Sequence, residues 1–168
     1  TARASTTAGS GSLNVASAMT TANGGYIRLA ADRNVNVNAA VSANTTGNVV
    51  LAAGLSGTGN INQSSSGTLT SGSGEINANA AGNINWNADA TTTGNILAQS
   101  GQAMTYGGNG TLNAASVALT SGTTIGTAAA AVQTNTGNLA VVNGGDAYVN
   151  NAGAVTLAGQ SSNNAGIN

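Results

Sequence analysis

Few residues in this chain are able to do acid–base chemistry. Carboxylates number four among 168 residues, at Asp32, Glu75, Asp89 and Asp146, and there is no histidine, cysteine or lysine. These absences exclude a Ser-His-Asp triad, a cysteine nucleophile, a lysine Schiff base and the usual zinc, haem and iron–sulfur ligand sets. A glycosidase needs two carboxyl groups about 5–9.5 Å apart, whereas these acids are typical of turn residues that aid solubility. We expect no catalytic residue, no metal site and no cofactor.

The other charged and glycine-rich segments point to no ligand. A formal net charge of −1 provides no basic surface for nucleic acid. The densest charge cluster, Arg28, Asp32 and Arg33, is interpreted as a surface ion pair, with binding of an acidic sugar or lyase chemistry as the alternative. Gly54–Gly59 resembles a nucleotide-binding loop but lacks a following helix, so a turn is expected. Gly107–Gly110 lacks the aspartates of a calcium-binding repeat.

The aromatic residues are the candidates for stacking on a ligand. Trp86 shares the parity of its aliphatic neighbour Ile84 and is predicted to face inward. Tyr26 and Tyr148 have the opposite parity to their aliphatic neighbours and are predicted to be exposed. Exposed rings stack on sugar faces, so both tyrosines are candidate glycan contacts. The alternative is that they are isolated surface residues.

Two further surface chemistries are open. Asn44 and Asn62 each begin an N-glycosylation sequon and are candidate acceptor sites. Threonine gathers at 91–93, 123–124 and 134–136, and threonine ladders on a β-solenoid order water in some ice-binding proteins. Such a face needs threonine at the same station of successive coils, and these steps are irregularly spaced.

Short strands must position these residues. One phrase recurs, in which glycine, a polar residue, an aliphatic residue and a second polar residue follow one another, as in Gly82-Asn83-Ile84-Asn85. Alternation with period two predicts half-buried strands of about 4–6 residues, each introduced by glycine or asparagine turn chemistry. The best local helix candidate, Ala128–Ala131, is too short to stand alone.

The strands return with a period of roughly 20 residues, which lies in the range of solenoid repeats. Two aliphatic series follow this period, one from Val15 through Val35 and Leu55 to Leu157 and another that begins at Ile27. The period predicts an all-β fold, a parallel β-helix in which strands pair with equivalents about 4.8 Å away in neighbouring coils. Residues 1–168 would form a single β-solenoid of about eight coils. Outward Asn, Thr and Ser would then form columns that hydrogen-bond along the axis; an antiparallel sandwich or β-roll is the alternative.

The Gly-Asn-aliphatic phrases, which begin at 47, 59, 82, 94 and 137, resemble the repeats of filamentous haemagglutinin-type exoproteins of bacterial two-partner secretion. Their uneven spacing is attributed to variable turns between fixed strands. The stretch 136–157 resembles the same repeats, and the similarity covers nearly the whole chain. It implies a right-handed β-helical rod, export through an outer-membrane partner, a role in adhesion or matrix formation, and no catalytic residues. Because the amino-terminal secretion domain of that family is absent, the chain would be a segment of the stalk.

The predicted function is therefore that of a non-enzymatic structural rod of a secreted or cell-surface bacterial filament or adhesin. No apolar run approaches the ~18 residues of a membrane helix, and no signal peptide is present, so no membrane insertion is expected. Neither end carries a recognisable cap, which predicts a longer array or end-to-end stacking of copies. The alternative is a carbohydrate-binding adhesion module for host or matrix glycans, followed by a polysaccharide-acting enzyme and an ice-binding protein.

Overall fold

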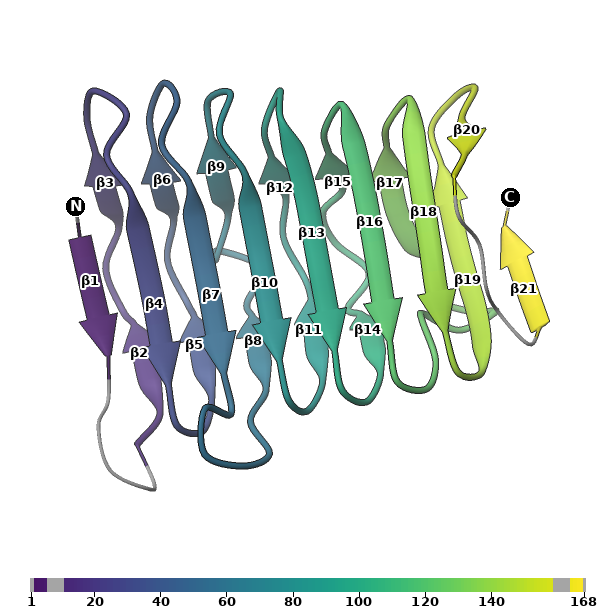
Figure 1. The fold of residues 1–168 in the computed structure, drawn as a ribbon, viewed down its shortest axis with the longest axis horizontal. Coiled ribbons are helices and arrows are strands. Elements are labelled where there is room, and N and C mark those ends of the chain that lie inside the picture. The colour runs from purple at the N-terminus through teal and green to yellow at the C-terminus, as the bar shows by residue number, and fades with distance from the viewer. Residues whose placement is uncertain (1, 6–10, 159–163, 168) are drawn as a thin grey trace.

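The computed structural model describes residues 2–5, 11–158 and 164–167, with side chains described over 11–158. All regular structure in these residues is β-strand. The strands pair in parallel with their equivalents in the coils before and after. The predicted parallel β-solenoid is confirmed, and the described chain winds through about seven coils (Figure 1).

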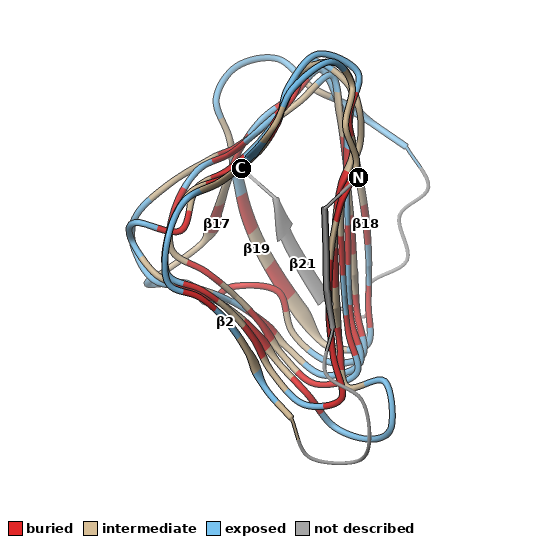
Figure 2. Ribbon diagram, turned by 90° about the vertical axis from the view of Figure 1, so that its left-hand side faces the viewer, coloured by how far each residue is buried: buried red, intermediate tan, exposed pale blue. Residues whose placement is uncertain are grey.

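Three sheets form the sides of the solenoid, and viewed along the axis they enclose a triangular interior (Figure 2). Sheet A has eight strands: β1 (Ala2–Ser5), β4 (Ile27–Ala31), β7 (Val49–Ala53), β10 (Ile76–Ala80), β13 (Asn95–Ser100), β16 (Ser116–Ser121), β18 (Asn138–Asn143) and β20 (Thr156–Leu157). Sheet B has five strands: β2 (Leu13–Val15), β5 (Val35–Val37), β8 (Ile61–Gln63), β11 (Ile84–Trp86) and β14 (Met104–Tyr106). Sheet C has eight strands: β3 (Met19–Thr21), β6 (Val41–Ala43), β9 (Leu69–Ser71), β12 (Ala90–Thr91), β15 (Leu112–Asn113), β17 (Val132–Asn135), β19 (Asp146–Asn151) and β21 (Asn164–Ile167).

The core is a set of aliphatic columns that run along the axis. Alternate residues of each strand face inward, and each stacks on its equivalent in the next coil. One column of sheet A is fully buried from β4 to β18 and consists of Ile27, Val49, Ile76, Ile96, Val117 and Leu139. Apolar surface is therefore buried at every coil, at about 25 cal/mol per Å². A core of this shape is filled by Ile, Leu, Val and Ala and needs few aromatic rings.

The 20-residue series predicted from the sequence follows this column only in part. From Ile76 onward the first series is one column, but Val15 and Val35 belong to sheet B. Leu55 lies in a loop between β7 and β8 and is 55% exposed. The second series likewise leaves sheet A after Ile27 and Val49, because its next member, Leu69, lies on sheet C. The physical reason is that coil lengths vary: bonded equivalents on sheet B are 22, 26, 23 and 20 residues apart.

The Gly-Asn-aliphatic phrases are uneven in spacing because they serve two different corners of the triangle. Those that begin at 47, 94 and 137 lead into sheet A, whereas those at 59 and 82 lead into sheet B. The glycine is required because successive backbones approach closely at a corner. A Cβ on Gly47 would lie under 3 Å from the carbonyl group of Gly25 in the preceding coil.

The segment Ala128–Ala131, the best helix candidate in the sequence, is not helical. It forms a turn in which Thr127 and Ala130 bond each other through both backbone N–H groups, at 3.1 and 3.0 Å.

Thr45 occupies a strained backbone conformation in the turn between β6 and β7, with φ of 59°. The equivalent position one coil earlier, two residues after the paired residues Thr21 and Ala43, holds Asn23 with φ of 54°. β-Branched side chains are disfavoured in this region, whereas asparagine tolerates it. We expect Thr45→Asn to raise the free energy of unfolding by about 1 kcal/mol, measured by urea denaturation. Thr46→Asn is the control and should give no gain; equal or lower stability of Thr45→Asn would contradict the strain.

Candidate functional site

The four carboxylates lie apart on the solenoid. Asp32 follows β4 and is only 9% exposed, Glu75 is half-buried before β10, Asp89 is exposed before β12, and Asp146 begins β19. Because Ile76 pairs with Ile96 and with Val49, Glu75 is level with Asn95 in the next coil and with Asn48 in the preceding one. Within the described residues no group of three or more His, Cys, Asp or Glu side chains is placed to hold a metal ion.

Two of these carboxylates accept structural hydrogen bonds. Asn77 Nδ2 donates to Glu75 Oε1 at 3.0 Å, and the Thr111 N–H donates to Asp89 Oδ1 at 2.8 Å. The second bond joins neighbouring coils, because Asp89 and Thr111 precede the paired strands β12 and β15. These acids hold turns in place.

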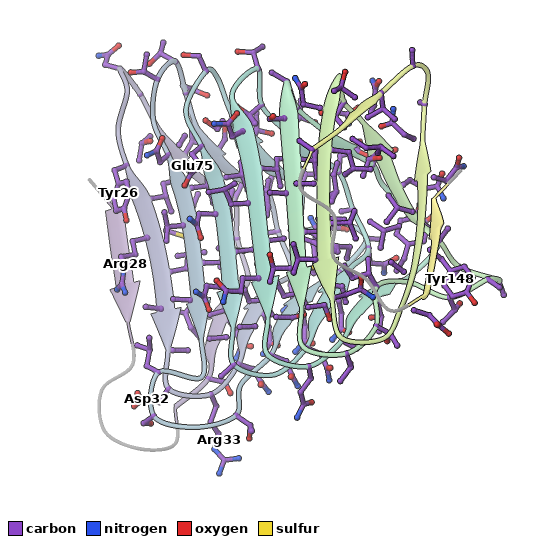
Figure 3. The ribbon with its side chains drawn as sticks, turned by 45° about the vertical axis from the view of Figure 1, so that its right-hand side comes forward. Tyr26, Arg28, Asp32, Arg33, Glu75 and Tyr148 are labelled. Atoms are coloured by element: carbon purple, nitrogen blue, oxygen red, sulfur yellow. The ribbon has the colours of Figure 1, made fainter. Side chains whose placement is uncertain are left out.

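The cluster Arg28, Asp32 and Arg33 is spread along one edge of the fold. Arg28 lies on β4, while Asp32 and Arg33 lie in the turn that follows it (Figure 3). The turn and the loop Gly54–Gly59 line a shallow hollow, to which Asp32, Arg33 and Thr58 contribute. Gly54–Gly59 is a turn followed by β8, as interpreted from the sequence.

The tyrosines proposed as glycan contacts do not form one platform. Tyr26 and Tyr148 lie at opposite ends of the solenoid (Figure 3), and each is half-buried, whereas their parity predicted exposed side chains. Trp86 is 1% exposed, which confirms its inward direction, and its Nε1 has no hydrogen-bond partner. Tyr106 packs next to it, and its hydroxyl donates to the Gly110 carbonyl at 2.8 Å. Burial raises the pKa of Tyr106, and the nearby Asp89 charge adds to the effect.

The two sequon asparagines have different surroundings. Asn44 is exposed in the turn after β6, where its Oδ1 accepts a bond from the Ser42 hydroxyl at 3.0 Å. Asn62 is half-buried on β8, and its Nδ2 is bonded to Asn36 Oδ1 at 2.8 Å. A glycan on Asn62 would be attached to the nitrogen that donates this bond, whereas the Asn44 bond uses Oδ1, which a glycan does not modify.

The threonine-rich steps do not form one exposed ladder. Thr92, Thr134 and Thr136 are all buried, at 4%, 1% and 5% exposure. Their hydroxyl groups bond backbone carbonyls, such as Thr92 to Gly74 at 2.6 Å and Thr136 to Ala115 at 3.0 Å. These side chains satisfy corner backbone groups.

A ladder of asparagine side chains runs along the outer face of sheet B, as the predicted polar columns required. The bonds run from Asn36 Nδ2 to Asn14 Oδ1 (2.6 Å), from Asn62 Nδ2 to Asn36 Oδ1 (2.8 Å), from Asn85 Nδ2 to Asn62 Oδ1 (2.6 Å) and from Thr105 Oγ1 to Asn85 Oδ1. Each amide therefore links its own coil to the next, and the ladder joins five successive coils. A hydrogen bond of this kind contributes about 0.5–1.5 kcal/mol.

A second ladder binds side chains to backbone at the corner before sheet B. Oδ1 of Asn34, Asn60 and Asn83 accepts the N–H of the equivalent residue one coil later, which is Asn60, Asn83 and Ala103, at 2.9, 2.8 and 3.0 Å. The same device serves sheet A, where Asn48 Oδ1 accepts the Glu75 N–H at 2.8 Å. In the phrases that begin at 47, 59 and 82, the asparagine thus accepts a corner N–H of the following coil.

Gln63 is a buried polar residue that no sequence motif marks. Its Oε1 accepts the N–H groups of Asn87 and Ala88, both at 3.0 Å. Its Nε2 donates to the carbonyl groups of Gly67 at 2.9 Å and Asp89 at 3.4 Å. One side chain therefore ties the corner of its own coil to the corner of the next. The signal in the sequence is its inward parity with Ile61, an unusual place for an amide.

Cutting the sheet B ladder at its middle is expected to weaken the coil junctions. Asn62→Ala removes the bonds to Asn36 and Asn85, and we expect the free energy of unfolding to fall by about 1–3 kcal/mol. Urea denaturation followed by circular dichroism measures the change. Asn38→Ala is the matched control, because Asn38 is exposed between β5 and β6 and should change stability by less than about 0.5 kcal/mol. Equal effects of the two variants would show that the ladder adds nothing.

Over the described residues, no helix is both long and apolar enough to cross a membrane. Comparison of the chain with protein-family models, with curated proteins and with solved structures gives no match.

Proposed function

We propose that this chain is a non-enzymatic structural rod segment of a bacterial filament or adhesin, secreted or at the cell surface. The observation that carries the proposal is the continuity of bonding along the axis. Three parallel sheets and two ladders of asparagine side chains cross the same coil junctions. A load that bends or stretches one junction is therefore shared by many hydrogen bonds at once.

The partners of such a segment are further coils. β1 and β20 are the outermost strands of sheet A in the described structure. A strand at the edge of a sheet presents unpaired N–H and C=O groups and is a template for another strand. The next coil comes either from a longer array or from another copy of the chain, and a net charge of −1 opposes stacking only weakly.

The resemblance of the Gly-Asn-aliphatic phrases to filamentous haemagglutinin-type repeats supports a secreted rod. Right-handed coiling, export through an outer-membrane partner and a role in adhesion or matrix formation are parts of this proposal. The β-helical repeat architecture is consistent with it.

A direct fusion of two full chains, head to tail, tests whether the ends accept further coils. In a solenoid, stability grows with each interface between repeats. We expect the fusion to unfold in one transition at a higher temperature than the single chain, and its maximum dimension by small-angle X-ray scattering to be about twice as long. Two independent bodies with the unfolding temperature of the single chain would contradict the rod.

A further inference from the structure

The outer face of sheet A differs from the other two sides of the solenoid because it exposes large apolar side chains. Leu97 on β13 and Val142 on β18 are 37% and 40% exposed. Val50, Ala118 and Ala140 occupy the same position as Leu97 on their own strands of sheet A. They therefore also face outward, and each is half-buried. Figure 2 shows this side, at β18, as a nearly straight edge of the triangle.

This face is almost without charge. The strands β7, β10, β13, β16 and β18 contain no charged residue. The two arginines of the sheet, Arg3 on β1 and its paired residue Arg28 on β4, are both at one end, and Glu75 lies at the margin, where Asn77 donates a hydrogen bond to it. A partner with a charged contact surface would lose hydration here and find almost no opposite charge in return. The face therefore suits a neutral surface.

The shape of the face is a ridge with a hollow on each side. Leu97 forms the ridge between a hollow lined by Asn95, Ala118 and Ala140 and another lined by Asn77, Asn79 and Thr120. A large side chain beside small ones is the pattern that lets two surfaces interdigitate.

We propose that this face binds the same face of a second copy of the chain, with the two solenoids antiparallel. Both surfaces then carry almost no charge. If the two-fold axis runs between the neighbouring strands β10 and β13, then β13 of each copy lies over β10 of the other, and the Leu97 ridge faces the hollow at Asn77 and Asn79. In a two-fold interface of this kind, each contact occurs twice. A parallel pair would place Arg28 of one copy against Arg28 of the other, whereas the antiparallel pair holds the two guanidinium groups at opposite ends of the interface, so charge repulsion favours the antiparallel arrangement.

The area of the face is sufficient for a specific but modest interface. Eight strands about 4.8 Å apart, of about five residues each, cover roughly 650 Å² per copy. The total of roughly 1,300 Å² is at the lower end of specific protein interfaces. The dimer is therefore expected to depend on concentration. This lateral dimer does not require end-to-end stacking of the solenoids.

Substitutions that copy a neighbouring coil test the proposal without disturbing the fold. Asn77 occupies the station of Leu97 in β10, and Thr120 occupies the station of Val142 in β16. Leu97→Asn and Val142→Thr should each weaken the dimer at least about tenfold, measured by sedimentation equilibrium of the full chain over a range of concentrations. The control is Leu55→Asn, since Leu55 is equally apolar and 55% exposed but lies in the β7–β8 loop; it should leave the dimer unchanged. Circular dichroism of every variant checks that the fold is intact.

Three results would overturn the inference: a monomer at all concentrations, a dimer insensitive to both face variants, or a dimer that Leu55→Asn weakens as much. End-to-end assembly gives a different signature. It produces an open series of larger species that persists in Leu97→Asn, so failure of the lateral contact leaves the rod proposal intact, and the converse also holds.

Discussion

Gln63→Leu is expected to lower the free energy of unfolding by about 3–4 kcal/mol, the largest effect among the side chains described. Leucine has nearly the volume of glutamine, so the packing of the column above Val37 changes little. The cost arises because the buried N–H of Ala88, the buried carbonyl of Gly67 and the partly buried N–H of Asn87 all lose their hydrogen-bond partner. Each buried group left unbonded costs about 1–3 kcal/mol.

The measurement is urea unfolding monitored by the fluorescence of Trp86, which is the sole tryptophan and lies on the strand paired with β8. Gln102→Leu is the matched control, since Gln102 lies exposed in the turn between β13 and β14, away from the outer face of sheet A. It should change stability by no more than about 0.5 kcal/mol. If Gln63→Leu proves as stable as the control, water or neighbouring groups replace the amide, and Gln63 does not fasten the corner.

Gly47→Ala is expected to destabilise the chain by about 3 kcal/mol through a clash between backbones. A Cβ at Gly47 would lie under 3 Å from the carbonyl of Gly25, and Gly74 approaches Gly47 in the same way from the next coil. Overpacking of a rigid site commonly costs about 1–3 kcal/mol, and more where backbone must move. The added methyl group would force apart two coils that the sheets hold together.

Gly57→Ala isolates this steric effect from the general effect of removing a glycine. A Cβ at Gly57 meets nothing within 4 Å, and Gly57 is not among the glycines with positive φ. Alanine there restricts the unfolded chain and is expected to be neutral or to stabilise by up to about 1 kcal/mol. Thermal unfolding of both variants decides the matter: similar losses at the two positions would contradict close approach at the corner.

The fold class was predictable because a solenoid repeats the same short sequence pattern in each coil. Alternation such as Gly82-Asn83-Ile84-Asn85 predicts a short strand wherever it occurs, and a long period predicts that strands stack in parallel. The period failed at Leu55 because the β7–β8 loop lengthens one coil. The mean spacing of the repeats does not reveal which coil contains an insertion. The pairing of Val49 with Ile76 could therefore not be predicted from the sequence and is seen only in the structure.

The candidate site was predictable in kind and not in detail. Asparagine columns were expected from the repeated polar stations, but the partners Asn36 and Asn62 follow from the 26-residue spacing of this coil. The role of Gln63 was not predictable because no sequence motif marks a buried glutamine. Its role depends on the corner at Asn87, which folds back so that the Asn87 N–H donates to the Gln63 side chain. The half-burial of Tyr148 depends on neighbouring coils that its own strand parity does not report.

The most direct test of the account is a nuclear Overhauser measurement between asparagine side-chain amides in solution. The ladder predicts contacts of the Asn62 Nδ2 protons with Asn36 and of the Asn85 Nδ2 protons with Asn62, across 26 and 23 residues. Observation of both contacts would establish the coil register and the axial bonding on which the rod depends. Contacts of Asn62 with residues at a uniform spacing of about 20, or with strands running antiparallel to β8, would contradict it.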